Sequence, residues 1–297
     1  MMRAPTAWSV AVRNPDGEIV ARRDELARLS ERNRAAKIPF VRGMLVLWES
    51  LSLGYRALSW SAVQATEDEE EPLTNAQIAW TMALAFAVFA GLFIVIPALA
   101  AKGVANESGI VFNVIEGVVR LGLFVGYIWL IGRSSEIARV FEYHGAEHMS
   151  IHAFEAGEPL SIESVARYRP EHPRCGTSFL LIVILGSIIL FTFLGIPGWF
   201  WLVVSRLVGI PLIAGLAYEL LRWSGTRPTE RLARVLAAPG IWLQRLTTSV
   251  PDVDQIEVAI SSLVVALDDE SAAEAIERGG IPESALAARR SVLTSEG

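Results

Sequence analysis

The chain has 297 residues and a formal net charge of −6, because 32 Asp and Glu outnumber 26 Lys and Arg. Hydrophobic residues make up 52% and charged residues 20%, slightly more apolar than a typical soluble protein. The single cysteine, Cys175, excludes an intramolecular disulfide and any Cys-x-x-Cys motif. The acidic balance, without a long basic block, argues against nucleic acid as a partner.

The N-terminal segment alternates apolar and polar residues from Trp8 to Arg22, around the sequence Asn14-Pro15-Asp16-Gly17. Pro fixes the backbone at the second turn position and Gly tolerates the fourth, so this pattern predicts a β-hairpin. From Arg23 to Lys37 the pattern becomes charged and helical, and we expect a short surface helix there.

The next segment, Ile38 to Ala62, is largely apolar, yet Arg42, Glu49 and Arg56 recur every seven residues and share one helical face. Charges on one stripe can stay at the headgroup level, so we expect a helix that lies in the membrane plane rather than across it. The acidic run that follows, residues 67–72, is typical of a solvated linker.

Four long apolar segments predict membrane-spanning helices in two hairpins. They are Ala76–Ala101, Ile110–Gly132, Phe179–Ile196 and Trp199–Leu221. Charged residues nevertheless occur in these spans, namely Glu116, Arg120, Arg206 and Glu219. Two explanations stay open for them: contacts that hold the bundle together, or a polar cavity beneath the central loop. The fold class predicted is a mainly α-helical, polytopic membrane protein with a short N-terminal β-hairpin.

The distribution of Lys and Arg predicts the orientation of the chain. The first 75 residues hold ten, residues 133–178 hold five and the chain from Arg222 holds eight, whereas the two short connections within the hairpins hold only Lys102. Both termini and the central loop are therefore expected on the cytoplasmic side of the inner membrane.

The predicted organisation has six parts. They are an N-terminal hairpin and helix (1–37), an interfacial helix and linker (38–75), the first membrane hairpin (76–132), a cytoplasmic helical loop (133–178), the second membrane hairpin (179–222) and a C-terminal region (223–297). In the last part we expect helices over Pro228–Val250 and Asp252–Leu267, and a mobile Ala-, Glu- and Ser-rich tail after Asp268.

All the histidines and the cysteine gather in the central loop. His144, His148, His152 and His172 lie within 29 residues, and Cys175 follows three positions later. His144 and His148 enclose the spacing His-x-x-Glu-His, the inverted form of the metalloprotease motif. Two histidines four apart on a helix project from one face and can bind one ion, with Glu147 close enough to activate water. We therefore expect a site for zinc or another divalent metal, with Glu147 as the catalytic base.

A third ligand should come from another segment, because Glu155 lies about 10 Å further along the same helix. The returning segment offers His172 and Cys175, so the predicted metal ligands are His144, His148 and one of these two. Cys175 has a second interpretation as a nucleophile with His172 as its base, since a neighbouring Arg and a helix start both lower a thiol pKa. We prefer the ligand role. His152 lies off the metal-facing stripe and is expected to be exposed.

Four stretches of the chain resemble the YqhQ-like bacterial membrane family, whose function is unknown. They are Tyr143–His148, His172–Phe179, Tyr218–Leu220 and Gln255–Ala259. Its members are described as predicted metal-dependent enzymes, so the resemblance implies a metal and an enzyme but no established substrate. Carried over by motif, it draws attention to His144, Glu147, His148, His172 and Cys175. Relatives have a Gly-rich stretch before the position of Met1, so an upstream start is expected.

These observations favour a zinc-dependent membrane hydrolase that acts at the cytoplasmic face on an unidentified substrate. The alternative is a non-catalytic scaffold or assembly factor, in which a metal or hydrogen bonds clamp the loop to the bundle. A metal transporter is disfavoured, because none of the four histidines lies in a predicted span. Membrane lipids are the expected partners, and a homo-oligomer is left open.

Overall fold

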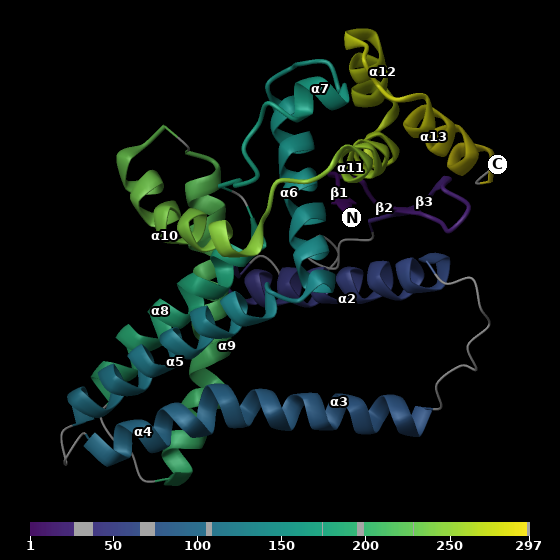
Figure 1. The fold of residues 1–297 in the computed structure, drawn as a ribbon. Helices are drawn as coiled ribbons and strands as arrows, with labels where there is room; N and C mark the ends of the chain where they lie inside the picture. Colours follow the sequence, from purple (N-terminus) through teal and green to yellow (C-terminus); the bar gives the residue numbers. More distant parts are fainter. Residues whose placement is uncertain are drawn as a thin grey trace.

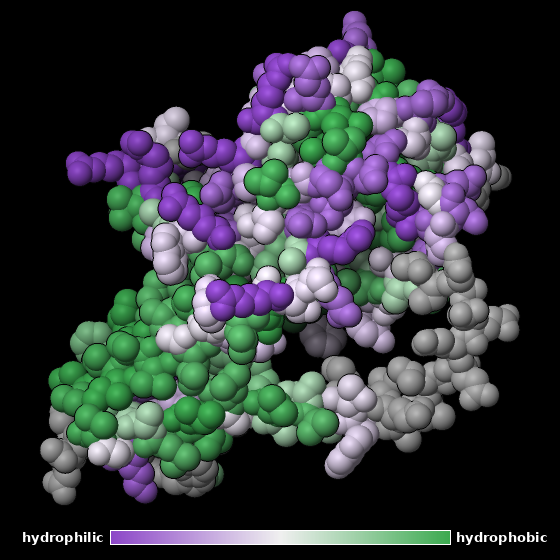
Figure 2. Space-filling view, viewed as in Figure 1, coloured by the Kyte–Doolittle hydropathy of each residue, from purple (hydrophilic) through white to green (hydrophobic). Residues whose placement is uncertain are grey.

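The structure is a computed structural model that describes residues 1–26, 38–65, 75–104, 109–173, 175–194, 199–227 and 229–295. Long apolar helices form a bundle, and the N-terminal strands, the central loop and the C-terminal helices gather at one end of it (Figure 1). Figure 2 shows the same division in the hydropathy of the surface: hydrophobic residues cover the bundle, and hydrophilic residues dominate the other end. We call the hydrophilic end, which contains the N-terminal strands, the central loop and the C-terminal helices, the extramembrane unit.

A three-stranded antiparallel sheet begins the chain. Strands β1 (Met2–Arg3), β2 (Ala7–Arg13) and β3 (Ile19–Glu25) pair in the order β1-β2-β3. The turn between β2 and β3 is closed by the amide of Gly17, which donates to the carbonyl of Asn14 at 2.9 Å, and Gly17 has a φ of 85°, which glycine adopts most readily. The predicted hairpin is confirmed.

The predicted surface helix after the hairpin is wrong at its start. Residues 23–25 continue β3, where Arg23 pairs with Ser9 of β2. Ladder pairing with β2 therefore overrides the weak helical pattern of these residues. The rest of that prediction, from residue 27 to residue 37, lies outside the described residues.

Helix α2 (Pro39–Ala65) lies between the bundle and the extramembrane unit (Figure 1). Its side chains Leu53 and Ala57 are buried with Trp8 and Val10 of β2. Another stripe of large apolar side chains on α2 is exposed; its members are Met44, Trp48, Leu51, Tyr55 and Leu58. A helix that packs on protein with one face and exposes a second apolar face fits a position at a membrane surface.

The charged stripe of α2 makes contacts with other parts of the protein. The guanidinium of Arg42 donates to both carboxylate oxygens of Glu219, at 3.0 and 2.5 Å, and so links α2 to the fourth span. Glu49 is buried and lies 3.5 Å from Arg3. Two of the three charges therefore face protein, and the apolar stripe is the outward one.

Among the described residues, four helices are long and apolar enough to cross a membrane: Ala83–Val104, Gly109–Ile131, Gly176–Phe193 and Val204–Gly225. The first combines α3 (Asn75–Ala90), the π-helical turn η2 (Gly91–Val95) and α4 (Ile96–Val104); the others are α5 (Gly109–Ile131), α8 (Gly176–Leu194) and α9 (Trp199–Gly225). The predicted number of spans and the two hairpins are confirmed, and these four candidate spans indicate a multi-pass membrane protein.

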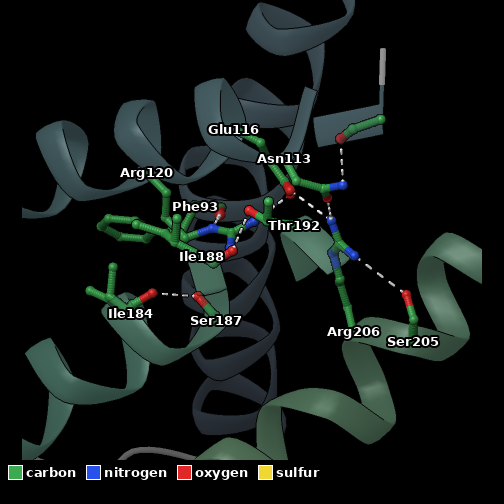
Figure 3. Close-up of polar contacts among 11 residues, drawn as sticks. Phe93, Asn113, Glu116, Arg120, Ile184, Ser187, Ile188, Thr192, Ser205 and Arg206 are labelled. Carbon is green, nitrogen blue, oxygen red and sulfur yellow. Dashed lines mark hydrogen bonds and ion pairs between the residues drawn. The ribbon is translucent and has the colours of Figure 1, made fainter. Parts of the chain in front are cut away.

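A buried ionic network joins the spans (Figure 3). Glu116 of α5 accepts hydrogen bonds from Arg120 at 2.5 Å and from Arg206 of α9 at 2.7 Å. Arg206 also donates to Asn113 at 3.0 Å, and its guanidinium lies 3.9 Å from the ring centre of Phe191 in α8. Of the two explanations for charged residues in the spans, these contacts fit the one in which polar side chains hold the bundle together.

The first span joins this network through its backbone. Arg120 donates from Nε to the carbonyl of Phe93 at 2.9 Å. Pro97 stands four residues after Phe93 and has no amide hydrogen, so it cannot donate the usual helical bond to that carbonyl. The same stretch is π-helical, with the amide of Ile96 bonded to the carbonyl of Gly91. The proline therefore frees an acceptor that a buried arginine uses.

The extramembrane unit is built around one buried helix, α11 (Val253–Ala266). An Asp252–Gln255 capping box starts it, which satisfies backbone donors at the helix N-terminus. The helices around it include α6 (Ser135–Glu155), α7 (Ile162–Val165) and α13 (Glu283–Ser295), with β2 on another side. The core between α11 and α6 contains Met149, Ala153, Ile256 and Ile260, so α6 is held rigidly against the unit.

The expected mobile tail is wrong. Residues after Asp268 form α12 (Asp269–Arg278) and α13, and Ala272, Ala275 and Ala285 are buried against the core. Arg289 is also buried and donates to the carbonyls of Val264 and Leu267 at the end of α11. Small side chains let these helices pack closely, so an alanine-rich composition here indicates close packing rather than disorder.

Candidate metal centre

Helix α6 carries His144, Glu147 and His148 on a rigid support. Ser134 precedes it in an extended conformation, and Glu136 lies in the first turn, where a negative charge favours the helix dipole. The helix ends at Ala156, and Gly157 follows with a φ of 73°. The helix is continuous across the motif, so His144 and His148 lie one turn apart, with ring centres separated by 4.4 Å.

The segment that returns toward α8 brings Cys175 to these histidines. Its backbone is held at His172, whose amide donates to Oε1 of Gln244 at 2.7 Å and whose carbonyl accepts from Nε2 of Gln244 at 2.9 Å. Gln244 belongs to α10 (Arg231–Thr247) and is fully buried. A glutamine side chain thus pairs with the backbone much as a neighbouring strand would, and fixes the path that leads to Cys175.

The two imidazoles and the thiol converge. Nε2 of His144 lies 3.2 Å from Sγ of Cys175, and one ligand atom from each of His144, His148 and Cys175 falls within 4.8 Å of the others. His148 and Cys175 are buried and His144 is half-buried. The described residues therefore contain a His/His/Cys cluster that could hold a metal ion.

Backbone carbonyls orient both rings. Nδ1 of His144 lies 2.9 Å from the carbonyl oxygen of Thr247, and Nδ1 of His148 lies 2.6 Å from that of Pro170. A carbonyl can only accept, so each Nδ1 carries a hydrogen, and Nε2 is the nitrogen of each ring that is left to bind a metal. Metal-binding histidines usually have such a partner on the nitrogen that does not bind the metal.

The sulfur is prepared as a thiolate. Burial raises the pKa of the Cys175 thiol, but hydrogen bonds and charge from His144 and His148 outweigh burial and lower this pKa to about 5. Burial lowers the pKa of His144, but the hydrogen bond with Cys175, the charge of the thiolate and the Thr247 carbonyl raise it above its ordinary value. The amide of Thr177 also donates to Sγ at 3.4 Å. Thiolate is the form of cysteine that binds metals.

Gly145 has a steric reason to stand next to His144. A Cβ at this position would overlap the carbonyl oxygen of Ser249. The amide of Ser249 in turn donates to the carbonyl of Phe141 at 3.0 Å. The chain that leaves α10 therefore crosses α6 in direct backbone contact at Gly145, only two residues after Thr247, whose carbonyl orients the His144 ring.

Glu147 lies beside the cluster and is not one of its three groups. Its Oε2 atom lies 3.5 Å from the terminal ammonium of Met1, and its charge contributes to the raised pKa of His144. It forms part of the wall of a cavity that also touches His144. Its role as a catalytic base stays a prediction.

His172 and His152 lie on the far side of His148. The ring of His172 is 5.6 Å from that of His148 and 4.5 Å from that of His152, and its Nε2 is 3.6 Å from Glu155. Of the two candidate third ligands, Cys175 is the one in the cluster; a ligand role for His172 stays a prediction. His152 was expected to be exposed but is half-buried, stacked on Tyr168 and bonded to the carbonyl of Glu171 at 3.0 Å.

Fold and site together define a polytopic membrane protein with a His/His/Cys cluster at one end of its spans. Residues 38–269 match the family described as "Protein of unknown function (DUF1385)". The chain is 31% identical over 276 residues to the uncharacterized protein YqhQ of Bacillus subtilis (strain 168), a match that covers 86% of this chain and 85% of that protein. The chain belongs to the DUF1385 family. No solved structure matches it.

Proposed function

We propose that this protein is a zinc-dependent membrane hydrolase with its site at the cytoplasmic membrane surface. One observation carries the proposal: His144 and His148 each donate from Nδ1 to a carbonyl and so present Nε2 beside the Cys175 thiolate. Two imidazoles and one thiolate are a donor set that suits zinc and leaves a coordination position open for water or substrate.

Each protein group has a defined task in this proposal. His144, His148 and Cys175 would hold the ion. A zinc ion there supplies Lewis acidity, which lowers the pKa of water to near neutrality and polarises a substrate carbonyl or phosphoryl group. Glu147 lies in the cavity wall beside His144. Its carboxylate accepts the proton that the water loses and then donates this proton to the leaving group.

The cytoplasmic placement follows from charge. The N-terminal segment, the central loop and the chain after α9 carry most of the Lys and Arg, and all three lie at the same end of the bundle (Figure 1). Cytoplasmic segments near membrane spans carry an excess of these residues, so we assign this end to the cytoplasmic side of the inner membrane.

A non-catalytic clamp is the second candidate. His144 and His148 belong to α6, whereas Cys175 directly precedes the third span, so a metal here would also fasten the extramembrane unit to the bundle. Structural zinc sites usually have four protein ligands, and His172 is the nearby residue that could supply a fourth. The cavity at His144 and Glu147 favours catalysis over this alternative.

The decisive experiment separates metal binding from catalysis. Glu147→Gln is compared with Glu136→Gln, a change at an exposed glutamate on the same helix. We expect both variants to retain zinc, and only Glu147→Gln to fail to complement a chromosomal deletion. If Glu147→Gln retains zinc and complements fully, the clamp replaces the hydrolase.

A further inference from the structure

A cavity of about 550 Å³ lies between α2, β2, α6 and α11. This size is typical of small-molecule sites. Most of its wall is apolar, and it includes Val12 of β2, Ala57 and Leu58 of α2 and Val140 and Tyr143 of α6. His144 and Glu147 complete the α6 wall, so the apolar chamber is continuous with the groups proposed to perform the reaction.

The cavity also borders the membrane-facing side of α2. Leu58, which lines it, belongs to the exposed apolar stripe of that helix, and Val140 across from it is exposed as well. Helix α2 lies at the level where the bundle meets the extramembrane unit (Figure 1). Leu58 and Val140 therefore give the cavity an apolar border on the side of α2.

A cation marks the polar part of the cavity. Arg139 lines the wall one helical turn before Tyr143, is exposed, and has no ion pair within the described ranges. The other arginine in the wall, Arg13, is already paired with Glu257 at 2.6 Å. A guanidinium that is not neutralised by the protein suits a phosphate group, which it can bind through two parallel hydrogen bonds.

We propose that the substrate is an anionic phospholipid that enters this cavity from the adjacent leaflet. Its acyl chains lie along Val12, Leu58 and Val140, and its phosphate lies at Arg139. His144 and Glu147 line the same cavity on the same helix, so a lipid bound there would share the cavity with these groups. The assignment of this lipid as substrate rests on the proposed hydrolase, whereas its binding in the cavity needs no metal.

Photo-crosslinking tests the binding directly. The full chain is reconstituted into phosphatidylcholine vesicles that contain a small fraction of phosphatidylglycerol with a photoreactive group in its acyl chain. We expect crosslinks on β2 and on the α6 residues that face the cavity, from Arg139 to Glu147. The same probe with a phosphatidylcholine headgroup should label these segments less, because it has no net negative charge for Arg139.

Matched variants locate the lipid. Ser61 lines the cavity and is half-buried, while Ser59 is exposed on the same helix. Ser61→Trp should lower labelling of α6 by about tenfold, equivalent to about 1.4 kcal/mol of binding free energy, whereas Ser59→Trp should leave it unchanged. Labelling confined to the spans and to the exposed stripe of α2, with no response to Ser61→Trp, would overturn the proposal.

One further variant separates this proposal from the hydrolase. His148 is a cluster residue but is not among those that line the cavity, so His148→Ala should abolish zinc binding and leave α6 labelling intact. Zinc-free protein that still shows cavity labelling would leave the lipid site standing without the enzyme. Zinc-loaded protein without cavity labelling would support the enzyme but exclude an anionic phospholipid as its substrate. Labelling of the cavity by a soluble amphiphile in place of the lipid would also exclude the phospholipid.

Discussion

Nε2 of His144 lies 3.2 Å from Sγ of Cys175, although the two residues are 31 positions apart in the chain. One residue belongs to the extramembrane helix α6 and the other directly precedes the third span. The contact therefore joins the two parts of the molecule at the point where the ligand set is assembled.

Ionisation of Cys175 should follow this contact. In metal-free protein its pKa is about 5, so the thiolate should predominate at neutral pH and disappear as the pH falls through about 5. Because this pKa is below that of an unfolded thiol, ionisation of Cys175 stabilises the folded protein. This contribution to folding stability is complete above the pKa of the unfolded thiol and is lost as the pH falls through about 5. The ultraviolet absorbance of the thiolate measures it. In His144→Ala the midpoint should move to a higher pH; an unchanged midpoint would contradict the contact.

Gln244→Ala should disturb the site from a distance. The change leaves the buried amide of His172 without its partner and removes one of the two hydrogen bonds to its carbonyl, which should lower stability by about 1–3 kcal/mol. Zinc affinity should also fall by about tenfold or more, as when other supporting groups around metal ligands are removed. Thermal unfolding in detergent and competition with a zinc chelator measure the two effects. Wild-type affinity in this variant would show that Gln244 does not position Cys175.

Gly145→Ala should separate the two segments that meet there. Its added Cβ would overlap the carbonyl of Ser249, so the chain after α10 must move, and the Thr247 carbonyl that orients His144 moves with it. Gly176→Ala is the control, because a Cβ there meets no atom within 4 Å although it adjoins Cys175. Zinc titration should show weaker binding for the first variant alone. Equal binding by both would contradict the close crossing.

The buried ionic network predicts an asymmetry between its members. Glu116 carries the negative charge opposite Arg120 and Arg206, so Glu116→Met leaves two uncompensated buried cations, whereas Arg206→Met leaves one ion pair. Breaking a buried pair costs about 3–5 kcal/mol. Glu116→Met should therefore reduce the yield of folded, membrane-inserted protein more than Arg206→Met does. Size-exclusion profiles in detergent measure this, and the reverse order would contradict the charge balance.

Local signals in the sequence were enough to predict much of the fold. The Asn-Pro-Asp-Gly turn identified the hairpin, and continuous apolar runs identified the spans, because both depend on residues close together in the chain. The tail was missed because Ala272, Ala275 and Ala285 pack through small side chains, which give little hydrophobic signal. The ion pair of Arg42 on α2 is not predictable from its own segment, because its partner Glu219 lies in another helix.

The site was predictable to a similar extent. The His-x-x-Glu-His spacing placed His144 and His148 on one helical face, and the clustering of His and Cys pointed to the returning segment. The choice between His172 and Cys175 was not accessible, because it depends on how Gln244 holds the chain. The roles of the Thr247 and Pro170 carbonyls were not predictable either, because every residue has a backbone carbonyl and the residue type does not indicate which one accepts a hydrogen bond.

The proposed function requires that His144, His148 and Cys175 bind one zinc ion. X-ray absorption at the zinc edge of gently purified protein tests it most directly. We expect about one zinc per chain, with one sulfur at about 2.3 Å and two imidazole nitrogens at about 2.0 Å, and loss of the sulfur signal in Cys175→Ser. Protein that contains no metal, or zinc whose first shell has no sulfur, would contradict it.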